Sequence, residues 1–353
     1  MPKPNNRRVP AEWELQSVVQ LTWPHTNSDW VNDLIAVEQT FACIATEVSR
    51  RQLVIVVCHS HDQIKHITGL IKIAGGDTDR LYICVTPSND TWARDHGPIS
   101  VLDNSSPRLL DFRFNGWGGR YPAKLDNMIT QNLDSTKTFG DTPVDSIDLE
   151  LEGGALDFDG HGTLLTTRSC LIDARDTKSK TQEEFEEIFF ELFGVVETHW
   201  LQNGRLEGDD TDGHIDTLAR FTDVETIAYQ GCDNTSDCHY EPLRRMASEL
   251  KSFQNFMGKP YRLVELPLPA PVYDKTGNRL PATYANFLVI NEAVLVPTYA
   301  DPADTTALKC LQTCFPDRTI IGIDCRSLIQ QFGSLHCATM HYPASVVPNL
   351  VRT

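Results

Sequence analysis

Four polar clusters in the sequence hold side chains whose types and spacing could do chemistry. Each lies beside an apolar run, and between them they supply carboxylates, a histidine and a cysteine. Such groups bind cations, transfer protons and act as nucleophiles. The clusters are NDTWARDHGP at 89–98, LELEGG at 149–154, GDDTDGHID at 208–216 and FGSLHCAT at 332–339.

The first cluster is suited to binding a planar cation. The carboxylate of Asp95 could hold a guanidinium group through two hydrogen bonds, and the ring of Trp92 could stack on the face of that group. The alternative is structural. In that case Asp90 and Arg94 form a surface ion pair and Trp92 is a core residue.

The second cluster places Glu152 directly before Gly153 and Gly154. Because glycine has no side chain, the backbone there can pass close to another group. Glu152 could therefore stand beside a reacting centre. By itself the pattern is also that of an ordinary acid at the end of a strand.

The third cluster carries a His-x-Asp pair after a glycine. In an extended segment His214 and Asp216 point to the same face, so the imidazole could move protons while the carboxylate binds a cation beside it. A metal site or a plain turn is the alternative. A calcium-binding EF-hand loop is excluded, because Gly208 and Ala219 occupy positions that require acids.

The fourth cluster contains our candidate nucleophile, Cys337. A cationic substrate or an imidazolium nearby would favour its thiolate form. The adjacent His336 would face the opposite side of a strand and need not be the base. The alternative for Cys337 is core packing, which we expect for Cys58 and Cys84 in the apolar runs LVIVVC and LYICV.

The composition narrows the class of partner. The formal net charge of −17 disfavours nucleic acid and favours cationic ligands. We find no signal peptide and no apolar stretch of membrane-spanning length, so we expect a cytoplasmic protein without a membrane partner. The ten cysteines are scattered without close pairs, which favours free thiols over a disulfide framework.

The elements that must position these clusters repeat along the chain. Two apolar runs joined by a turn indicate a hairpin at 155–167, from Leu218 and from Phe287. Apolar residues recur every three or four positions, as in a helix, at 30–51, 181–193, 240–253 and 302–315. Polar clusters precede the hairpins near residues 90, 152, 209, 284 and 333, so we expect about five similar modules. We predict one domain over 1–353, with a long loop at about 267–281.

Several motifs together resemble the family of agmatine deiminases and bacterial peptidylarginine deiminases. The likeness runs from Trp23-Pro24-His25 to Pro343, and the motifs stand in the same order as in that family. The motifs are WARDHGP, FNGWGGRY, LEGGALDFDGHGTLLTT, TDGHID and GSLHC.

The resemblance implies a fold, a reaction and a set of roles. The fold is an α/β five-bladed propeller, and the reaction is hydrolysis of agmatine to N-carbamoylputrescine and ammonia through a covalent cysteine thiouronium, as in putrescine synthesis. No metal and no organic cofactor are implied. The residues implied are Cys337 as nucleophile, His214 as general acid and base, Asp95 and Asp216 as guanidinium clamps, Glu152 as the orienting acid, and Trp92 and Arg94 as substrate-binding residues.

Three residues depart from the commoner family pattern. Ala155 follows the Glu-Gly-Gly, His96 follows Asp95, and Phe332 precedes the glycine of the cysteine loop. None belongs to the implied chemistry. We expect them to shape the pocket that reads the rest of the substrate.

The competing functions differ in substrate or in class. Peptidylarginine or free-arginine deimination keeps the same chemistry, but an α-carboxylate calls for a positioned arginine such as Arg94, Arg120 or Arg220. Other classes are a non-catalytic polyamine- or cation-binding protein and a metal-dependent amidohydrolase that uses 209–216. An assembly of several identical chains is left open.

Overall fold

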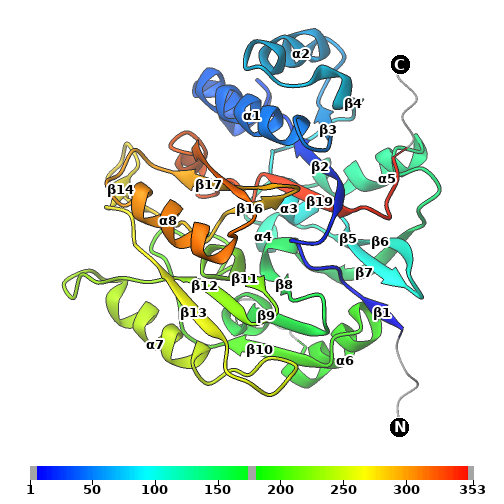
Figure 1. Cartoon of the computed structure of the whole chain (residues 1–353). Coiled ribbons are helices and arrows are strands. Elements are labelled where there is room, and N and C mark those ends of the chain that lie inside the picture. Colours follow the sequence, from blue (N-terminus) through cyan, green and yellow to red (C-terminus); the bar gives the residue numbers. More distant parts are fainter. Residues whose placement is uncertain (1–5, 174–179, 349–353) are drawn as a thin grey trace.

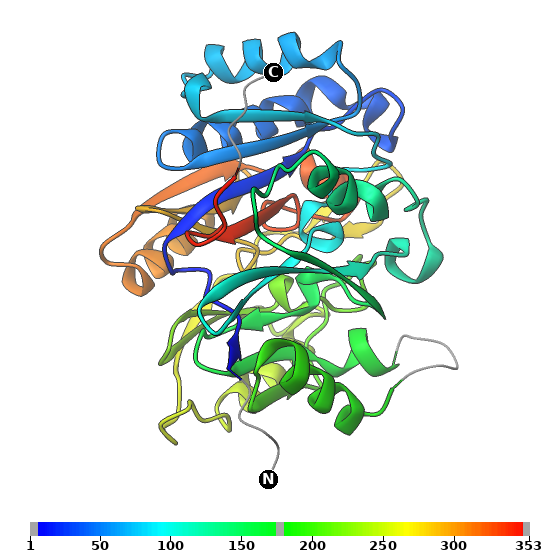
Figure 2. The same ribbon diagram turned by 90° about the vertical axis from the view of Figure 1, so that its right-hand side faces the viewer.

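The structure is a computed structural model that describes residues 6–173 and 180–348. Five of its six sheets share one plan: an antiparallel pair of strands, then a helix, then a strand parallel to the second strand of the pair. In four of the five the pair is a hairpin. The longer helices lie at the periphery of the molecule in both views, with the hairpins between them (Figures 1 and 2). None of the described helices is both long and apolar enough to cross a membrane.

Three of these sheets form from consecutive stretches in the middle of the chain. The first of the three also takes up the N-terminal strand β1. The first sheet and its helix comprise β1 Arg7–Arg8, β5 Ile99–Asp103, β6 Ser106–Arg113, α5 Ile129–Ser135 and β7 Val144–Glu150. The second comprises β8 Asp157–Phe158, β9 Thr163–Thr167, α6 Gln182–Phe193 and β10 Glu197–Leu201. The third comprises β11 Ala219–Asp223, β12 Thr226–Gln230, α7 Tyr240–Leu250 and β13 Arg262–Leu266.

The other two sheets complete the set, and one of them joins the two ends of the chain. Strand β19, near the C-terminus, pairs antiparallel with β2, near the N-terminus, with Thr339 opposite Leu21. The red and blue arrows lie side by side in Figure 1. The sheet that does not include the chain ends comprises β16 Leu288–Ile290, β17 Ala293–Thr298 and β18 Thr319–Asp324, with helix α8 Asp304–Cys314. The sheet that joins the ends comprises β19 Thr339–Pro343, β2 Gln16–Thr22, β3 Leu53–Cys58 and β4 Leu81–Val85, with helices α1 Leu34–Ser49 and α2 Gln63–Ile73.

Local sequence explains where these elements form. Strand β3 lies between β2 and β4 in a parallel part of the sheet, where both faces are covered, so its run LVIVVC is apolar throughout. Helix α6 begins at a capping box between Thr181 and Glu184 and ends at Gly194 in the left-handed conformation. The three hairpins and four helices expected from periodicity are therefore present.

Two smaller expectations need adjustment. The segment 267–281 connects β13 to β16, but it contains a short hairpin of β14 Val272–Tyr273 and β15 Arg279–Leu280. Cys58 is fully buried as expected, whereas Cys84 is only partly buried, because β4 is the edge strand of its sheet. No two of the ten cysteines, all of which lie in the described residues, form a disulfide.

Candidate active site

A cavity of about 140 Å³ lies where the polar clusters meet. Cys337, His214, Asp95 and Trp92 all line it, although they come from three widely separated segments. Cys337 is buried within an apolar cluster, as its alternative role in core packing would require, but it also lines the same cavity as the imidazole of His214. Ten further lining residues were not singled out as substrate contacts from the sequence, and those with acidic or aromatic side chains are Asp29, Asp90, Trp117, Tyr121, Asp209 and Asp210.

Asp95 is held by two donors from neighbouring segments. The backbone N–H of Gly154 donates to Oδ1 and the indole Nε1 of Trp117 donates to Oδ2, both at 3.0 Å. A Cβ atom at Gly154 would lie 2.5 Å from Nδ1 of His214 and 2.8 Å from Oδ1 of Asp95. The glycine pair after Glu152 is thus required by close approach, as expected.

The segment that carries His214 and Asp216 is not extended, so that expectation is wrong. His214 immediately precedes a short 3₁₀ helix, Ile215–Thr217. The chain turns because Asp209 accepts a hydrogen bond from the N–H of Gly213 and Thr211 accepts one from the N–H of His214. His214 nevertheless lines the cavity, whereas Asp216 does not line it and instead lies with its Oδ2 3.7 Å from the sulfur of Cys337.

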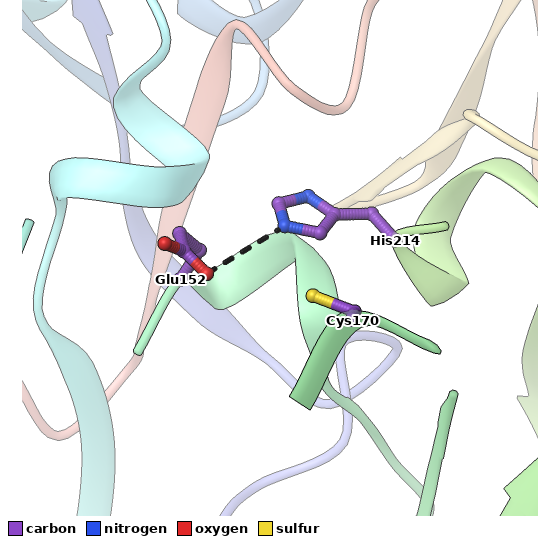
Figure 3. A group of neighbouring side chains, drawn as sticks. All are labelled: Glu152, Cys170 and His214. Atoms are coloured by element: carbon purple, nitrogen blue, oxygen red, sulfur yellow. Dashed lines mark ion pairs between the residues drawn. The ribbon is translucent and has the colours of Figure 1, made fainter. Parts of the chain in front are cut away.

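The imidazole of His214 lies between two carboxylates, those of Asp95 and Glu152, and Figure 3 shows the second of them. Its Nδ1 is 3.6 Å from Oδ1 of Asp95 and its Nε2 is 3.8 Å from Oε2 of Glu152. Burial lowers the pKa of His214, but the charge of Asp95, together with Cys170 and Glu152, raises that pKa well above its ordinary value. Both ring nitrogens are buried without a hydrogen-bond partner.

The pKa of Asp95 also responds to this environment. Burial raises it to about 6, and the nearby charges of Asp216 and Glu152 act in the same direction, opposed by His214. The carboxylate is therefore ionised near neutral pH but loses its charge in mild acid.

Cys337 is held by Asn286, a residue that was not predicted. The Nδ2 of Asn286 donates to the sulfur at 3.2 Å, and its Oδ1 accepts from the N–H groups of His336 and Cys337. The sulfur is 3.7 Å from Oδ2 of Asp216. Burial, with the charges of Asp216 and Asp95, raises the pKa of the Cys337 thiol well above its ordinary value. A neutral thiol is the expected resting form.

Asp216 is positioned from behind by a buried ionic network, which we call the Glu12 network (Glu12, Arg94, Asp157, Arg220, His336). His336 bridges Oδ2 of Asp216 and Oε2 of Glu12, at 2.8 Å each. Arg220 in turn donates to Glu12 at 2.7 Å and to Asp157 at 2.6 Å. Burial raises the pKa of Asp216, but His336 outweighs it, so that pKa lies below its ordinary value. His336 thus supports Asp216, although it is not in the cavity.

Trp92 forms one wall of the cavity and is fixed by Asp90. The indole Nε1 groups of Trp92 and Trp30 both donate to the carboxylate of Asp90, at 3.1 and 2.8 Å. The alternative surface pair between Asp90 and Arg94 is therefore not formed. A Cβ atom at Gly333 would lie 2.2 Å from the Trp92 ring, so the cysteine loop packs directly on the indole.

None of the three arginines considered for a substrate carboxylate lines the cavity. Arg94 turns away to His341 Nδ1 at 3.2 Å, so its expected place among the substrate contacts is not where the structure puts it. Arg120 bonds Asp212 at 2.7 Å and the carbonyl oxygen of Asp210. Arg220 is committed to the Glu12 network. Among the described residues that line the cavity, there is no lysine or arginine.

The acids of 209–216 bind protein donors and do not converge as metal ligands. Asp209 caps the turn, Asp210 accepts from Tyr121 at 2.9 Å, and Asp212 pairs with Arg120. In the part of the chain that the structure describes, these acids do not form a group of three close enough to share an ion. The metal-dependent alternative therefore lacks a ligand set in this segment.

The three residues that depart from the family pattern lie in different places. Phe332 lines the cavity and adopts a left-handed φ of 67°, an uncommon conformation for an aromatic residue. Ala155 is buried in the core beside α6, and His96 is buried against Thr22 at 3.1 Å. Only Phe332 can contact a ligand in the cavity.

The residues that sequence reasoning missed are Glu12, Asn286 and Trp117. Asn286 belongs to the polar cluster noted near residue 284, and Trp117 lies in the motif FNGWGGRY, so each carried a weak signal. Glu12 carried none, because its partners His336 and Arg220 lie more than two hundred residues away.

An α/β fold of repeated ββαβ units that brings a thiol, an imidazole and carboxylates into one small cavity defines the class of protein. The chain belongs to the Porphyromonas-type peptidyl-arginine deiminase family, which matches residues 8–343.

Relatives and solved structures cover nearly the whole chain. The agmatine deiminase of Pseudomonas aeruginosa is 28% identical over 97% of this chain and 97% of its own. The agmatine deiminase of C. jejuni with substrate bound is 36% identical, with a TM-score of 0.87 over 95% of this chain and 96% of that chain. A Porphyromonas gingivalis protein provisionally described as an arginine deiminase is 48% identical, with a TM-score of 0.90 over 97% and 99%.

Proposed function

We propose that the protein is an agmatine deiminase, a hydrolase that converts agmatine to N-carbamoylputrescine and ammonia. One observation carries the proposal: the thiol of Cys337 lines an acidic cavity together with Asp95 and His214, its sulfur is 3.7 Å from Asp216, and no lysine or arginine is among the described residues of the lining. The relatives named agmatine deiminase, which match over nearly their whole length, support it.

In this proposal Asp95 and Asp216 bind the guanidinium group and Trp92 covers its face. A delocalised cation between two carboxylates keeps its charge, which leaves the central carbon open to attack. The same cation offsets the negative charges that raise the pKa of Cys337. Substrate binding therefore favours the thiolate, and the thiol proton leaves to solvent.

The chemistry then proceeds in two halves. The thiolate adds to the guanidinium carbon, and the protonated imidazole of His214 gives its proton to one nitrogen, so that the C–N bond breaks and ammonia leaves. The thiouronium remains on sulfur. His214, now neutral, takes a proton from water as the water adds to the same carbon. The C–S bond then breaks to release the thiolate and the ureido product, and the proton of the added hydroxyl leaves to solvent. Glu152 orients the imidazole throughout.

The choice of agmatine over arginine rests on the charge around the cavity. Asp29, Asp90, Asp209 and Asp210 line it, and they suit the distal amine of a dication. These acids would repel the α-carboxylate of arginine. That carboxylate would also have no guanidinium partner, because Arg94, Arg120 and Arg220 are bonded to other groups. The similarity to the P. gingivalis arginine deiminase favours arginine as the second candidate.

Three structural statements belong to the same proposal. The five sheets are the blades of a five-bladed α/β propeller, supported by their common plan and by the fold of the solved relatives. The chain acts as one catalytic domain. The reaction takes place in the cytoplasm, where reduced cysteines are the normal state.

The decisive experiment compares kcat/KM for agmatine, arginine and an arginine-containing peptide, each with and without a chelator. We expect agmatine to exceed arginine by at least about 100-fold, because an unpaired buried carboxylate costs several kcal/mol. A larger value for arginine would overturn the substrate. Binding of agmatine without turnover would indicate a cation-binding protein, and turnover abolished by the chelator would indicate a metal-dependent hydrolase.

A further inference from the structure

Cys170 lies against the imidazole of His214, although no step of the proposed reaction uses it. The side chains of Glu152, Cys170 and His214 are all buried, and each offers one potential ligand atom. These three atoms lie within 4.8 Å of one another. Figure 3 shows the sulfur and the carboxylate on the same side of the ring, so the three groups face a common point.

The three residues reach that point from separate segments. Glu152 follows β7, Cys170 lies in the single π-helical turn Ser169–Asp173 after β9, and His214 precedes the 3₁₀ helix at 215–217. Their meeting is therefore a result of the tertiary fold and not of local sequence. Glu152 and His214 belong to the proposed reaction, but the position of Cys170 adds a sulfur that this reaction does not need.

The spacing and chemistry of the cluster match those of a zinc site. Zinc binds sulfur at about 2.3 Å and nitrogen or oxygen at about 2.0–2.2 Å in a tetrahedron, so its ligand atoms lie roughly 3.3–3.8 Å apart. The His214 Nε2 to Glu152 Oε2 distance is 3.8 Å. A thiolate, an imidazole and a carboxylate form a set that favours zinc over magnesium or calcium.

The imidazole is also ready to accept an ion. His214 is 1% exposed, and neither of its ring nitrogens has a hydrogen-bond partner. Such a buried nitrogen gains a partner if it coordinates a metal. His214 lines the cavity, which gives an ion a route to the site.

We propose that Glu152, Cys170 and His214 form an inhibitory binding site for Zn²⁺. Coordination replaces the thiol proton of Cys170 and any proton on His214, so protons are released to solvent and zinc binds more tightly as pH rises. The bound ion occupies the ring nitrogen that faces Glu152. The inhibition rests on the proposed deiminase function, whereas the binding does not.

A second cluster in the described chain provides an internal contrast. Asp237, Cys238 and His239 also lie within 4.8 Å of one another. There the guanidinium of Arg279 already contacts Asp237 at 2.9 Å and Cys238 at 3.7 Å. A cation would be repelled by that charge, so we expect no zinc at the second cluster.

Cobalt serves as a spectroscopic probe for the site, because Co²⁺ bound to a thiolate gives a charge-transfer absorption in the near ultraviolet. We expect this band in the full-length protein and in Cys337→Ser and Cys238→Ser, and we expect Cys170→Ser to lose it. Calorimetric titration with Zn²⁺ should give one site, weakened at least tenfold in Cys170→Ser.

The opposite pattern would overturn the proposal. A band lost in Cys337→Ser but kept in Cys170→Ser would place the ion on the nucleophile, and absence of stoichiometric zinc binding would exclude the site altogether. If Cys170→Ser fails to fold, X-ray absorption of zinc-loaded Cys337→Ser decides. A sulfur shell near 2.3 Å then supports the site, and a shell of nitrogen and oxygen alone refutes it.

Activity provides a separate readout. Zn²⁺ should inhibit agmatine turnover by the unmodified protein, a chelator should restore it, and the residual turnover of Cys170→Ser should resist zinc. Equal inhibition of both proteins would contradict the proposal. If agmatine is not turned over at all, the proposed function fails while the cobalt and calorimetric results still test the metal site.

Discussion

Two buried clusters of charge meet at Asp216, and they are built in opposite ways. In the Glu12 network the bonds made by Arg220 and His336 are 2.6–2.8 Å long, whereas Arg94 stands 3.9 Å from Glu12. In the cavity His214 stands 3.6 and 3.8 Å from its carboxylates, and Oδ1 of Asp216 is buried without a partner. Apart from one nitrogen of Arg94, the described polar atoms of the Glu12 network are paired, whereas both ring nitrogens of His214 in the cavity are not.

This difference separates the two tasks of the site. A complete ionic network holds its members in place, because breaking any pair leaves an isolated buried charge. An incomplete cluster of acids keeps an affinity for an incoming cation, and its fixed geometry needs little rearrangement when that cation binds. The first cluster therefore supplies rigidity and the second supplies binding and reactivity.

Removal of a cavity group should abolish turnover without unfolding the protein. For Cys337→Ser we expect kcat to fall at least about 10⁴-fold, because no other nucleophile lies in the same position. The melting temperature should change little. The matched control is Cys238→Ser, at an exposed cysteine, which should keep kcat within a factor of about two. A Cys337→Ser protein with substantial turnover would exclude covalent catalysis by this thiol.

Removal of a charge from the Glu12 network should cost mainly stability. Glu12→Gln removes one of the two buried carboxylates that bind Arg220, with Asp157 left as the other, and also removes the charged partner of His336. We therefore expect the free energy of unfolding to fall by about 3–5 kcal/mol. The control is Glu14→Gln at a half-exposed pair with Arg8, where about 0–1 kcal/mol is expected. Denaturant titration measures both. Equal effects would mean that the network is no more stabilising than a surface pair.

The pH profile tests whether the incomplete cluster depends on Asp95. The cationic substrate binds to the ionised carboxylate of Asp95, and the pKa of Asp95 is raised to about 6. We therefore expect kcat/KM to fall about tenfold per pH unit below that value. Asp90 also has a pKa raised to about 6 by burial. If the Asp90→Asn variant still shows the same fall of kcat/KM at low pH, that fall is due to Asp95. A fall of kcat/KM that begins only near pH 4 would contradict the assignment of this pH dependence to Asp95.

A steric change at the cavity wall should give the smallest effect. In Gly333→Ala the new methyl group would collide with Trp92, and we expect a loss of about 1–3 kcal/mol in stability together with a raised KM. Gly69→Ala is the control, because a Cβ atom there meets nothing within 4 Å and α2 should gain about 0.5–1 kcal/mol. An unchanged KM would show that Trp92 does not contact the substrate.

The cavity and the Glu12 network also differ in how far they could be predicted from the sequence. Asp95, His214 and Cys337 stand in motifs whose residue types indicate their chemistry, and periodicity located the hairpins and helices around them. The partner of a buried charge has no such local signature. Glu12 meets His336 and Arg220 through long-range packing alone, and the 3₁₀ turn at Asp216 depends on hydrogen bonds that Asp209 and Thr211 accept from backbone N–H groups. The cavity groups were therefore predictable, and the network behind them was not.

The pairing of β19 with β2 has a consequence for protein synthesis. A ribosome makes β2 more than three hundred residues before Cys337 and β19. Any shortened product that stops before Cys337 lacks the nucleophile and also leaves β2 as an open sheet edge, which favours aggregation. Incomplete copies are thus inert toward metabolites and prone to clearance.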